Sequence, residues 1–197
     1  AAYNGGVAAL LAADPDEVAK RTITFSAGQN AVVISDEDLT DLTGSGLPSM
    51  RQATAADLLV LTTSSKINTV APSTNLWGIT EPLEDGDVLI PSDIQAIETA
   101  RVAFNTSIKA IADADTDLIF FDVAAVMEEL STTGIAYGTG YVNSDYVTGG
   151  AFSLDGVHPT ARGYAVVTNR MLDAINSGFN ANIPPVDPGA YSTVFIK

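Results

Sequence analysis

The chain of 197 residues is 46% hydrophobic and 17% charged, which favours a globular domain with a buried core over a disordered chain. Its formal charge of −15 excludes nucleic acid and anionic membrane surfaces as good partners, because their phosphates would repel it. With no cysteine and one histidine, disulfides, thiolate catalysis and Cys- or His-rich metal sites are excluded, and we expect no cofactor and no metal.

The N-terminal part is predicted to begin with a helix and to continue as a β-hairpin. Residues 3–11 carry apolar side chains at helical spacing, and the Asp-Pro-Asp run at 14–16 ends that helix. Two β-rich runs, 22–25 and 31–34, are joined by a link that contains Gly28, which is typical of a hairpin.

The next stretch is acidic and irregular. Residues 35–41 form an acidic cluster that lacks the residue order of a calcium loop, so a solvated loop is the simpler interpretation. Residues 58–61 are a candidate for a buried strand. The long connection 62–87 contains the only tryptophan, Trp77, which either lines a substrate cleft or packs this loop onto the rest of the protein.

Helices and a strand alternate in the second half. Ser92 and Gln95 fit a capping box at the start of an amphipathic helix that extends to residue 111. The run 118–121 is continuously apolar, which is typical of a strand covered on both faces. Asp122, which follows it, either belongs to a functional site or caps the helix over 123–130.

The C-terminal part is predicted to be a loop, a last helix and a tail. Residues 131–150 form a loop whose tyrosines contact a substrate or cover the core. Thr160 caps the last helix, Gly178 ends it, and 184–197 is an extended tail.

The strongest functional signal lies between that loop and the last helix. Asp155-Gly156-Val157-His158-Pro159 contains the only histidine in the chain, with a carboxylate three residues before it. Imidazole accepts and returns protons near neutral pH, and a carboxylate on its second nitrogen fixes the tautomer, as in a Ser-His-Asp triad. Alternatively, the turn only caps a helix or binds its own loop.

Asp-Gly-Val-His-Pro-Thr at 155–160, followed by Gly163 and Tyr164, resembles the C-terminal block of the SGNH (GDSL-type) hydrolases. The likeness is greatest to large SGNH proteins of Bacteroidetes-type cell envelopes, and the runs 51–54, 88–89 and 152–176 share it. In that family the Asp and His of this block are members of the catalytic triad, so the resemblance implies that Asp155 and His158 are catalytic.

The chain departs from the family pattern at two places. It contains no Gly-Asp-Ser nucleophile motif and no Gly-x-Asn-Asp block, which supplies part of the family's oxyanion hole. Gly28-Gln29-Asn30 is either a remnant of that block or only a turn, since Ala31 stands where the family has Asp. We therefore interpret residues 1–197 as the C-terminal portion of one SGNH-like domain.

The fold class predicted from alternating helix and strand is α/β. The resemblance implies a three-layer, flavodoxin-like α/β/α domain that lacks its first strands and carries a β-rich insertion at 22–61.

It also implies a serine esterase or acylhydrolase whose serine lies outside this chain, in an N-terminal segment of the same protein. The expected substrates are an ester-bearing small molecule, a lipid or an acylated glycan. The expected location is the cell envelope, as an outer-membrane-associated lipoprotein, or the secreted fraction. The alternative is a non-catalytic binding or structural component of the envelope that keeps the fold.

Overall fold

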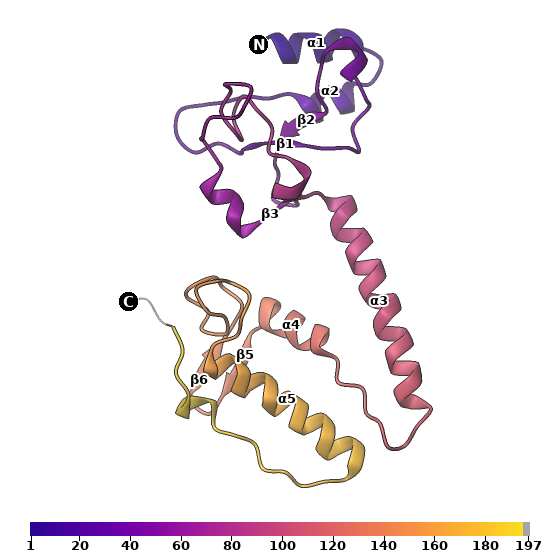
Figure 1. Ribbon diagram of the computed structural model, residues 1–197, viewed down its shortest axis with the longest axis vertical. Coiled ribbons are helices and arrows are strands. Elements are labelled where there is room, and N and C mark those ends of the chain that lie inside the picture. Colours follow the sequence, from indigo (N-terminus) through magenta and orange to yellow (C-terminus); the bar gives the residue numbers. More distant parts are fainter. Residues whose placement is uncertain (195–197) are drawn as a thin grey trace. The chain divides into compact units, whose positions relative to one another are not determined.

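The computed structural model describes residues 1–194, which combine helices with small sheets, in agreement with the coarse α/β prediction. The chain divides into two compact units, Ala1–Ala100 (unit 1) and Arg101–Lys197 (unit 2). Figure 1 draws both units and labels their helices and all strands except β4 (Val88–Leu89). The assignment of all 197 residues to one SGNH-like domain stays a prediction.

Unit 1 consists of short elements around a small apolar cluster. Ile34, Leu83, Val88 and Ile90 are buried together, and Trp77 packs against them, so the packing role of this tryptophan is the one observed. The helices and strands of unit 1 are α1 (Ala2–Leu10), α2 (Pro15–Arg21), β1 (Val33–Ser35), β2 (Met50–Gln52), β3 (Leu58–Leu59) and β4 (Val88–Leu89), with 3₁₀ turns at Thr43–Ser45, Leu61–Ser65 and Asp85–Asp87.

The predicted hairpin over 22–34 is wrong. Strand β1 pairs instead with β2, and residues 22–25 form no strand. The backbone amides of this run donate to side chains instead. The N–H of Ile23 donates to Asn4 Oδ1 at 3.0 Å, and that of Thr24 donates to Gln52 Oε1 at 2.9 Å. Because these amides are bonded to side chains, they are not available for the hydrogen bonds of a β-sheet.

Two further predictions for unit 1 need correction. Residues 58–61 are not a buried strand, since Leu58 and Leu59 form only the short strand β3 and their side chains are exposed. Ser92 does not cap the long helix, because the helix already begins at Pro91, a favoured first residue. The N–H of Ile90 just before it donates to Asp93 Oδ2.

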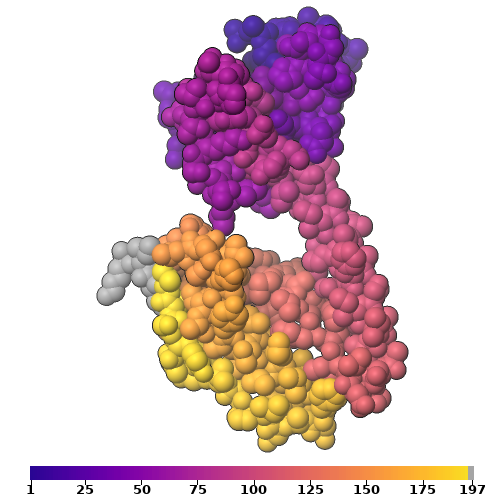
Figure 2. Space-filling view, in the orientation of Figure 1, coloured from indigo at the N-terminus to yellow at the C-terminus, as the bar shows by residue number. Residues whose placement is uncertain are grey.

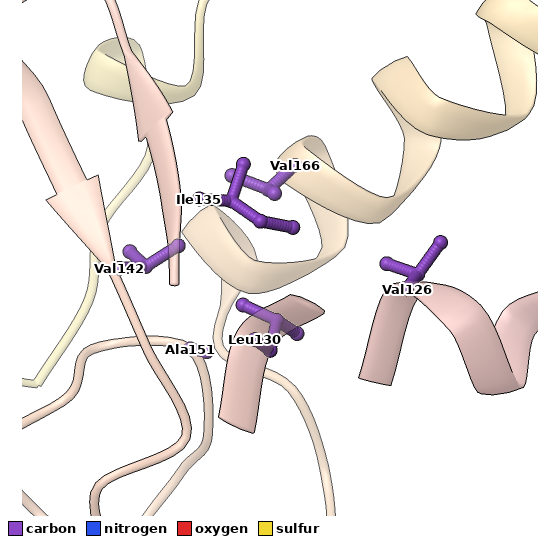
Figure 3. Packing of buried hydrophobic residues seen from close by; sticks show 6 residues of the cluster. All are labelled: Val126, Leu130, Ile135, Val142, Ala151 and Val166. Carbon is purple, nitrogen blue, oxygen red and sulfur yellow. The ribbon is translucent and has the colours of Figure 1, made fainter. Parts of the chain in front are cut away.

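The long helix α3 (Pro91–Asp113) continues from unit 1 into unit 2. The remaining helices and strands of unit 2 are α4 (Val123–Thr132), β5 (Ile135–Tyr137), β6 (Gly140–Val142) and α5 (Ala161–Phe179), with a 3₁₀ turn at Pro188–Ala190. Strands β5 and β6 form an antiparallel hairpin. The six side chains of the core, shown in Figure 3, come from α4, the hairpin, the loop before the His-bearing turn, and α5: Val126, Leu130, Ile135, Val142, Ala151 and Val166.

Two caps predicted from the sequence are confirmed. Asp122 accepts from the N–H of Ala125, so it caps α4, and Thr160 accepts from the N–H of Gly163, so it caps α5. Gly178, however, does not end α5, which continues to Phe179 and closes on Asn180 in the left-handed conformation. A Cβ at Gly178 would come within 2.3 Å of Ile119 Cγ2, so glycine allows α5 to lie against Ile119.

The predicted strand over 118–121 is absent, and within the described residues 1–194 no parallel sheet forms. The sheets within residues 1–194 are three antiparallel pairs of two strands each. Residues 118–121 have no regular secondary structure between α3 and α4, and within that described range no strand lies beside them. An apolar run gives a strand only where another strand takes its backbone hydrogen bonds.

Candidate functional site

Asp155 and His158 lie on a closed turn that is fixed to the core of unit 2. The N–H of Ser153 donates to the carbonyl of His158 at 2.8 Å, and that of Thr160 donates to the carbonyl of buried Ala151 at 2.9 Å. Gly156 has φ +72°, which glycine adopts without strain. The turn therefore brings residues 153 and 158 together and ties both to the packed body below.

The carboxylate of Asp155 is fully hydrogen-bonded by this turn. Its Oδ1 accepts from Ser153 Oγ at 2.6 Å and from the N–H groups of Val157 and His158, each at 2.9 Å. Its Oδ2 lies 2.7 Å from His158 Nδ1. The Ser153 hydroxyl first, then the two amides and the imidazole, hold the pKa of Asp155 far below its usual range.

This arrangement fixes the tautomer of neutral His158. An ionised carboxylate only accepts hydrogen bonds, so Nδ1 must carry the proton and Nε2 is left with its lone pair. The histidine side chain is 73% exposed, and within residues 1–194 no group hydrogen-bonds to Nε2. The pair thus presents a basic nitrogen to the surface of the protein.

Helix α5 begins against this turn because Gly163 has no side chain. A Cβ there would come within 2.1 Å of the carbonyl oxygen of Ala151. Thr160 Oγ1 links the two segments, since it donates to the carbonyl of Gly150 at 2.8 Å and accepts from the N–H of Gly163 at 3.0 Å. Gly163 is one of the residues on which the resemblance rests, and its physical role is to allow this close approach.

The tyrosines of residues 131–150 have structural partners, and this region is not all loop as predicted, because Tyr137 lies in β5 and Tyr141 lies in β6. Tyr146 donates to the carbonyl of Leu154 at 2.7 Å and so supports the His-bearing turn from outside. Tyr141 donates to the carbonyl of Thr133, and Tyr137 accepts from Arg162 at 2.9 Å. These bonds match the covering role left open by the sequence rather than free groups awaiting a substrate.

The described residues complete neither an oxyanion hole nor a cleft at His158. Asn30 closes a local turn: its Oδ1 accepts from the N–H of Ser26 and its Nδ2 donates to the carbonyls of Ser26 and Gly28, so the turn interpretation is the one observed. A cavity of about 350 Å³ in unit 2 lies against Tyr137 and Arg170, and neither Asp155 nor His158 lines it. The nucleophile expected from outside the chain has no counterpart at Nε2 within residues 1–194.

An acidic group that sequence reasoning missed lies in unit 1. Glu37, Asp85 and Asp93 each offer a carboxylate oxygen, and these oxygens lie within 4.8 Å of one another. Such oxygens suit a hard cation such as Ca²⁺ or Mg²⁺. The three residues are far apart in the chain, so no local sequence motif predicts that they lie together. Exposed acids also gather without an ion, and Asp93 already accepts from the N–H of Ile90.

Comparison with known proteins yields no relative: no family model, no curated protein and no solved structure matches the chain. None of the helices within residues 1–194 is long and apolar enough to cross a membrane. We therefore infer function from the geometry of Asp155 and His158.

Proposed function

We propose that this chain carries the aspartate and the histidine of the catalytic triad of an SGNH-type serine esterase or acylhydrolase. The observation that supports the proposal is the 2.7 Å contact between Asp155 Oδ2 and His158 Nδ1, together with an Nε2 that faces solvent. The three-layer α/β/α fold and the place in the cell envelope belong to the same proposal, since they come from the same resemblance.

In the proposed reaction His158 Nε2 takes the proton of a serine hydroxyl as the serine oxygen attacks the ester carbonyl carbon. The imidazolium then gives this proton to the alkoxide oxygen of the leaving alcohol, and an acyl-serine remains. A water molecule repeats the two steps and releases the carboxylic acid. Asp155 stays ionised throughout, keeps the ring oriented and stabilises the imidazolium.

The serine and the oxyanion donors belong, in this proposal, to an N-terminal segment of the same protein outside residues 1–197. The substrate is an ester on a small molecule, a lipid or an acylated glycan. A charge of −15 disfavours substrates with exposed phosphate groups.

Fluorophosphonate labelling of the native protein tests the proposal. We expect one serine to be labelled, and we expect the rate to fall by about 10³-fold or more in His158→Ala, because the serine loses its base. Asp173→Asn is the matched control: Asp173 is an exposed acid on α5 with no partner within residues 1–194, and its loss leaves labelling unchanged. Labelling that survives His158→Ala contradicts the assignment of the base.

The second candidate is a non-catalytic envelope component that keeps the same turn. One observation favours it: within residues 1–194 no hydroxyl reaches Nε2 of His158. Folded native protein in which no serine reacts with the fluorophosphonate, while a known serine esterase in the same sample does react, supports this candidate instead.

A further inference from the structure

The segment Leu118–Phe121, called here the open segment, has backbone groups without partners. The N–H of Leu118 donates to Asp115 and the carbonyl of Phe121 accepts from Val123. Between these two bonds, the N–H groups of residues 119–121 and the carbonyls of 118–120 make no hydrogen bond to any other residue in the described range 1–194. Backbone groups in folded proteins are almost always paired with protein or water.

The side chains of the open segment are those of an interior strand. All four are apolar, yet Leu118 is 47% exposed and Ile119 and Phe120 are only half-buried. Phe121 packs on the core of unit 2, and Ile119 lies against Gly178 of α5. Ile119 and Phe121 thus pack against the rest of unit 2, while Leu118 and part of Phe120 remain exposed to solvent.

A hollow of about 520 Å³ lies along the open segment. Leu118, Ile119 and Phe120 form one wall, and α5 contributes Ala174 and Gly178. Helix α3, which has no buried residue within its bounds, ends beside it. Atoms of α3 form part of the surface drawn in Figure 2. The exposed side chains of this helix include Phe104, Ile108 and Ile111.

Carboxylates stand at both ends of the open segment. Asp115 and Asp117 precede it and Asp122 follows it, and within residues 1–194 none of the three forms an ion pair. The cation nearest in sequence, Lys109, is bound to Asp113 at 2.6 Å. An incoming strand with basic ends is therefore favoured, whereas a second copy of this acidic chain brings the same carboxylates into apposition.

We propose that the open segment is a docking edge for an apolar β-strand of another polypeptide, flanked by lysine or arginine. The incoming strand pairs with the free N–H and carbonyl groups of alternate residues along one edge, its side chains pack beside Leu118 and Phe120, and its basic ends meet the aspartates. The proposal uses neither Asp155 nor His158 and so does not depend on the esterase chemistry, but it competes with the three-layer fold of the proposed function, whose first strands would pair with this same segment.

The probe is a ten-residue peptide with two lysines at each end and alternating valine and threonine between them. Its binding to the full chain is measured by fluorescence anisotropy, and backbone exchange of residues 119–121 is followed by NMR. We expect amide exchange within this segment to slow by about tenfold or more on binding, because a ladder hydrogen bond must open first. Exchange that is unchanged at saturating peptide overturns the proposal.

Two altered peptides separate strand pairing from simple charge attraction. Methylation of alternate peptide nitrogens keeps charge and composition but removes ladder donors, so we expect binding to weaken by about tenfold or more. Replacement of the lysines by serine is expected to weaken binding and its salt dependence. Equal binding of the methylated peptide means that the acidic surface merely attracts cations, and the proposal fails.

Protein variants locate the site. Leu118→Asp is expected to reduce peptide affinity by about tenfold or more, because it adds a charge to the edge. The matched control is Leu61→Asp, at a similarly exposed leucine in unit 1, which leaves affinity unchanged. Preserved NMR shifts of Ile135 and Val142 show that the core of unit 2 is folded. A chain that sediments as a dimer, and as a monomer only after Leu118→Asp, assigns the edge to a second copy and overturns the proposed partner.

Discussion

The two carboxylate oxygens of Asp155 contact different groups, and only Oδ2 contacts the imidazole of His158. Oδ2 faces Nδ1 of the imidazole at 2.7 Å, while Oδ1 is occupied by Ser153 Oγ and two backbone amides. The carboxylate cannot turn away from the ring without the loss of these bonds. The turn is therefore a rigid holder for one tautomer of one histidine.

Asp155→Asn should reverse the tautomer of His158. The amide oxygen of Asn has to replace Oδ1, which accepts three hydrogen bonds, so the amide NH₂ then points at Nδ1. Nδ1 becomes the acceptor and Nε2 carries the proton. We expect ¹⁵N NMR of the neutral ring to show protonated Nδ1 in the parent chain and protonated Nε2 in the variant. The same tautomer in both chains contradicts the contact as described.

Ser153→Ala should raise the pKa of Asp155 toward its usual range. The Ser153 hydroxyl is the first of the groups that lower this pKa, and the two amides and the imidazole remain in the variant. Carboxyl ¹³C titration of the parent and variant chains measures the change. Ser131→Ala is the control, because its hydroxyl donates to the carbonyl of Glu128 and contacts no carboxylate. If the pKa of Asp155 is unchanged in Ser153→Ala, the Ser153 hydroxyl does not lower it and the prediction is wrong.

Local signals in the sequence were sufficient for the His-bearing turn and not for the sheets. Thr160 and Asp122 act through amides three residues ahead, so short patterns reveal them. The predicted strand at 118–121 is absent because a strand needs a neighbour that no local pattern specifies, and the approach of Glu37 to Asp93 depends on how distant segments pack. Contacts between segments that are distant in the chain cannot be predicted from the residue pattern of either segment alone.

The stability of unit 1 should fall in acid because of one buried ion pair. Arg51 Nη2 lies 2.7 Å from Asp57 Oδ1, and the guanidinium lowers the pKa of Asp57 to about 2. A lowered carboxyl pKa stabilises the fold fully above the unfolded value of about 4, and this contribution is lost as the pH falls toward 2.

Urea unfolding followed through Trp77, the only tryptophan, measures this effect in unit 1. We expect the free energy of unfolding to decrease between about pH 4 and pH 2. Asp57→Ala leaves Arg51 paired with Asp36 and bonded to the carbonyl of Gln52, and should cost about 1 to 3 kcal/mol at neutral pH, with a flatter acid dependence. Parallel acid curves for the parent and the variant contradict the assignment to this pair.

Gly163→Ala should destabilise the turn that carries His158. The added Cβ meets the carbonyl oxygen of Ala151 at 2.1 Å, and a backbone atom cannot rotate away as a flexible side chain does. We expect unit 2 to lose about 1 to 3 kcal/mol and the contact between Asp155 and His158 to loosen. Gly5→Ala on α1 is the matched control, because a Cβ there meets nothing within 4 Å and stabilises the helix by about 0.5 to 1 kcal/mol. Thermal unfolding and the His158 ring shifts report both effects, and a Gly163→Ala chain as stable as its parent contradicts the close approach of α5 to the turn.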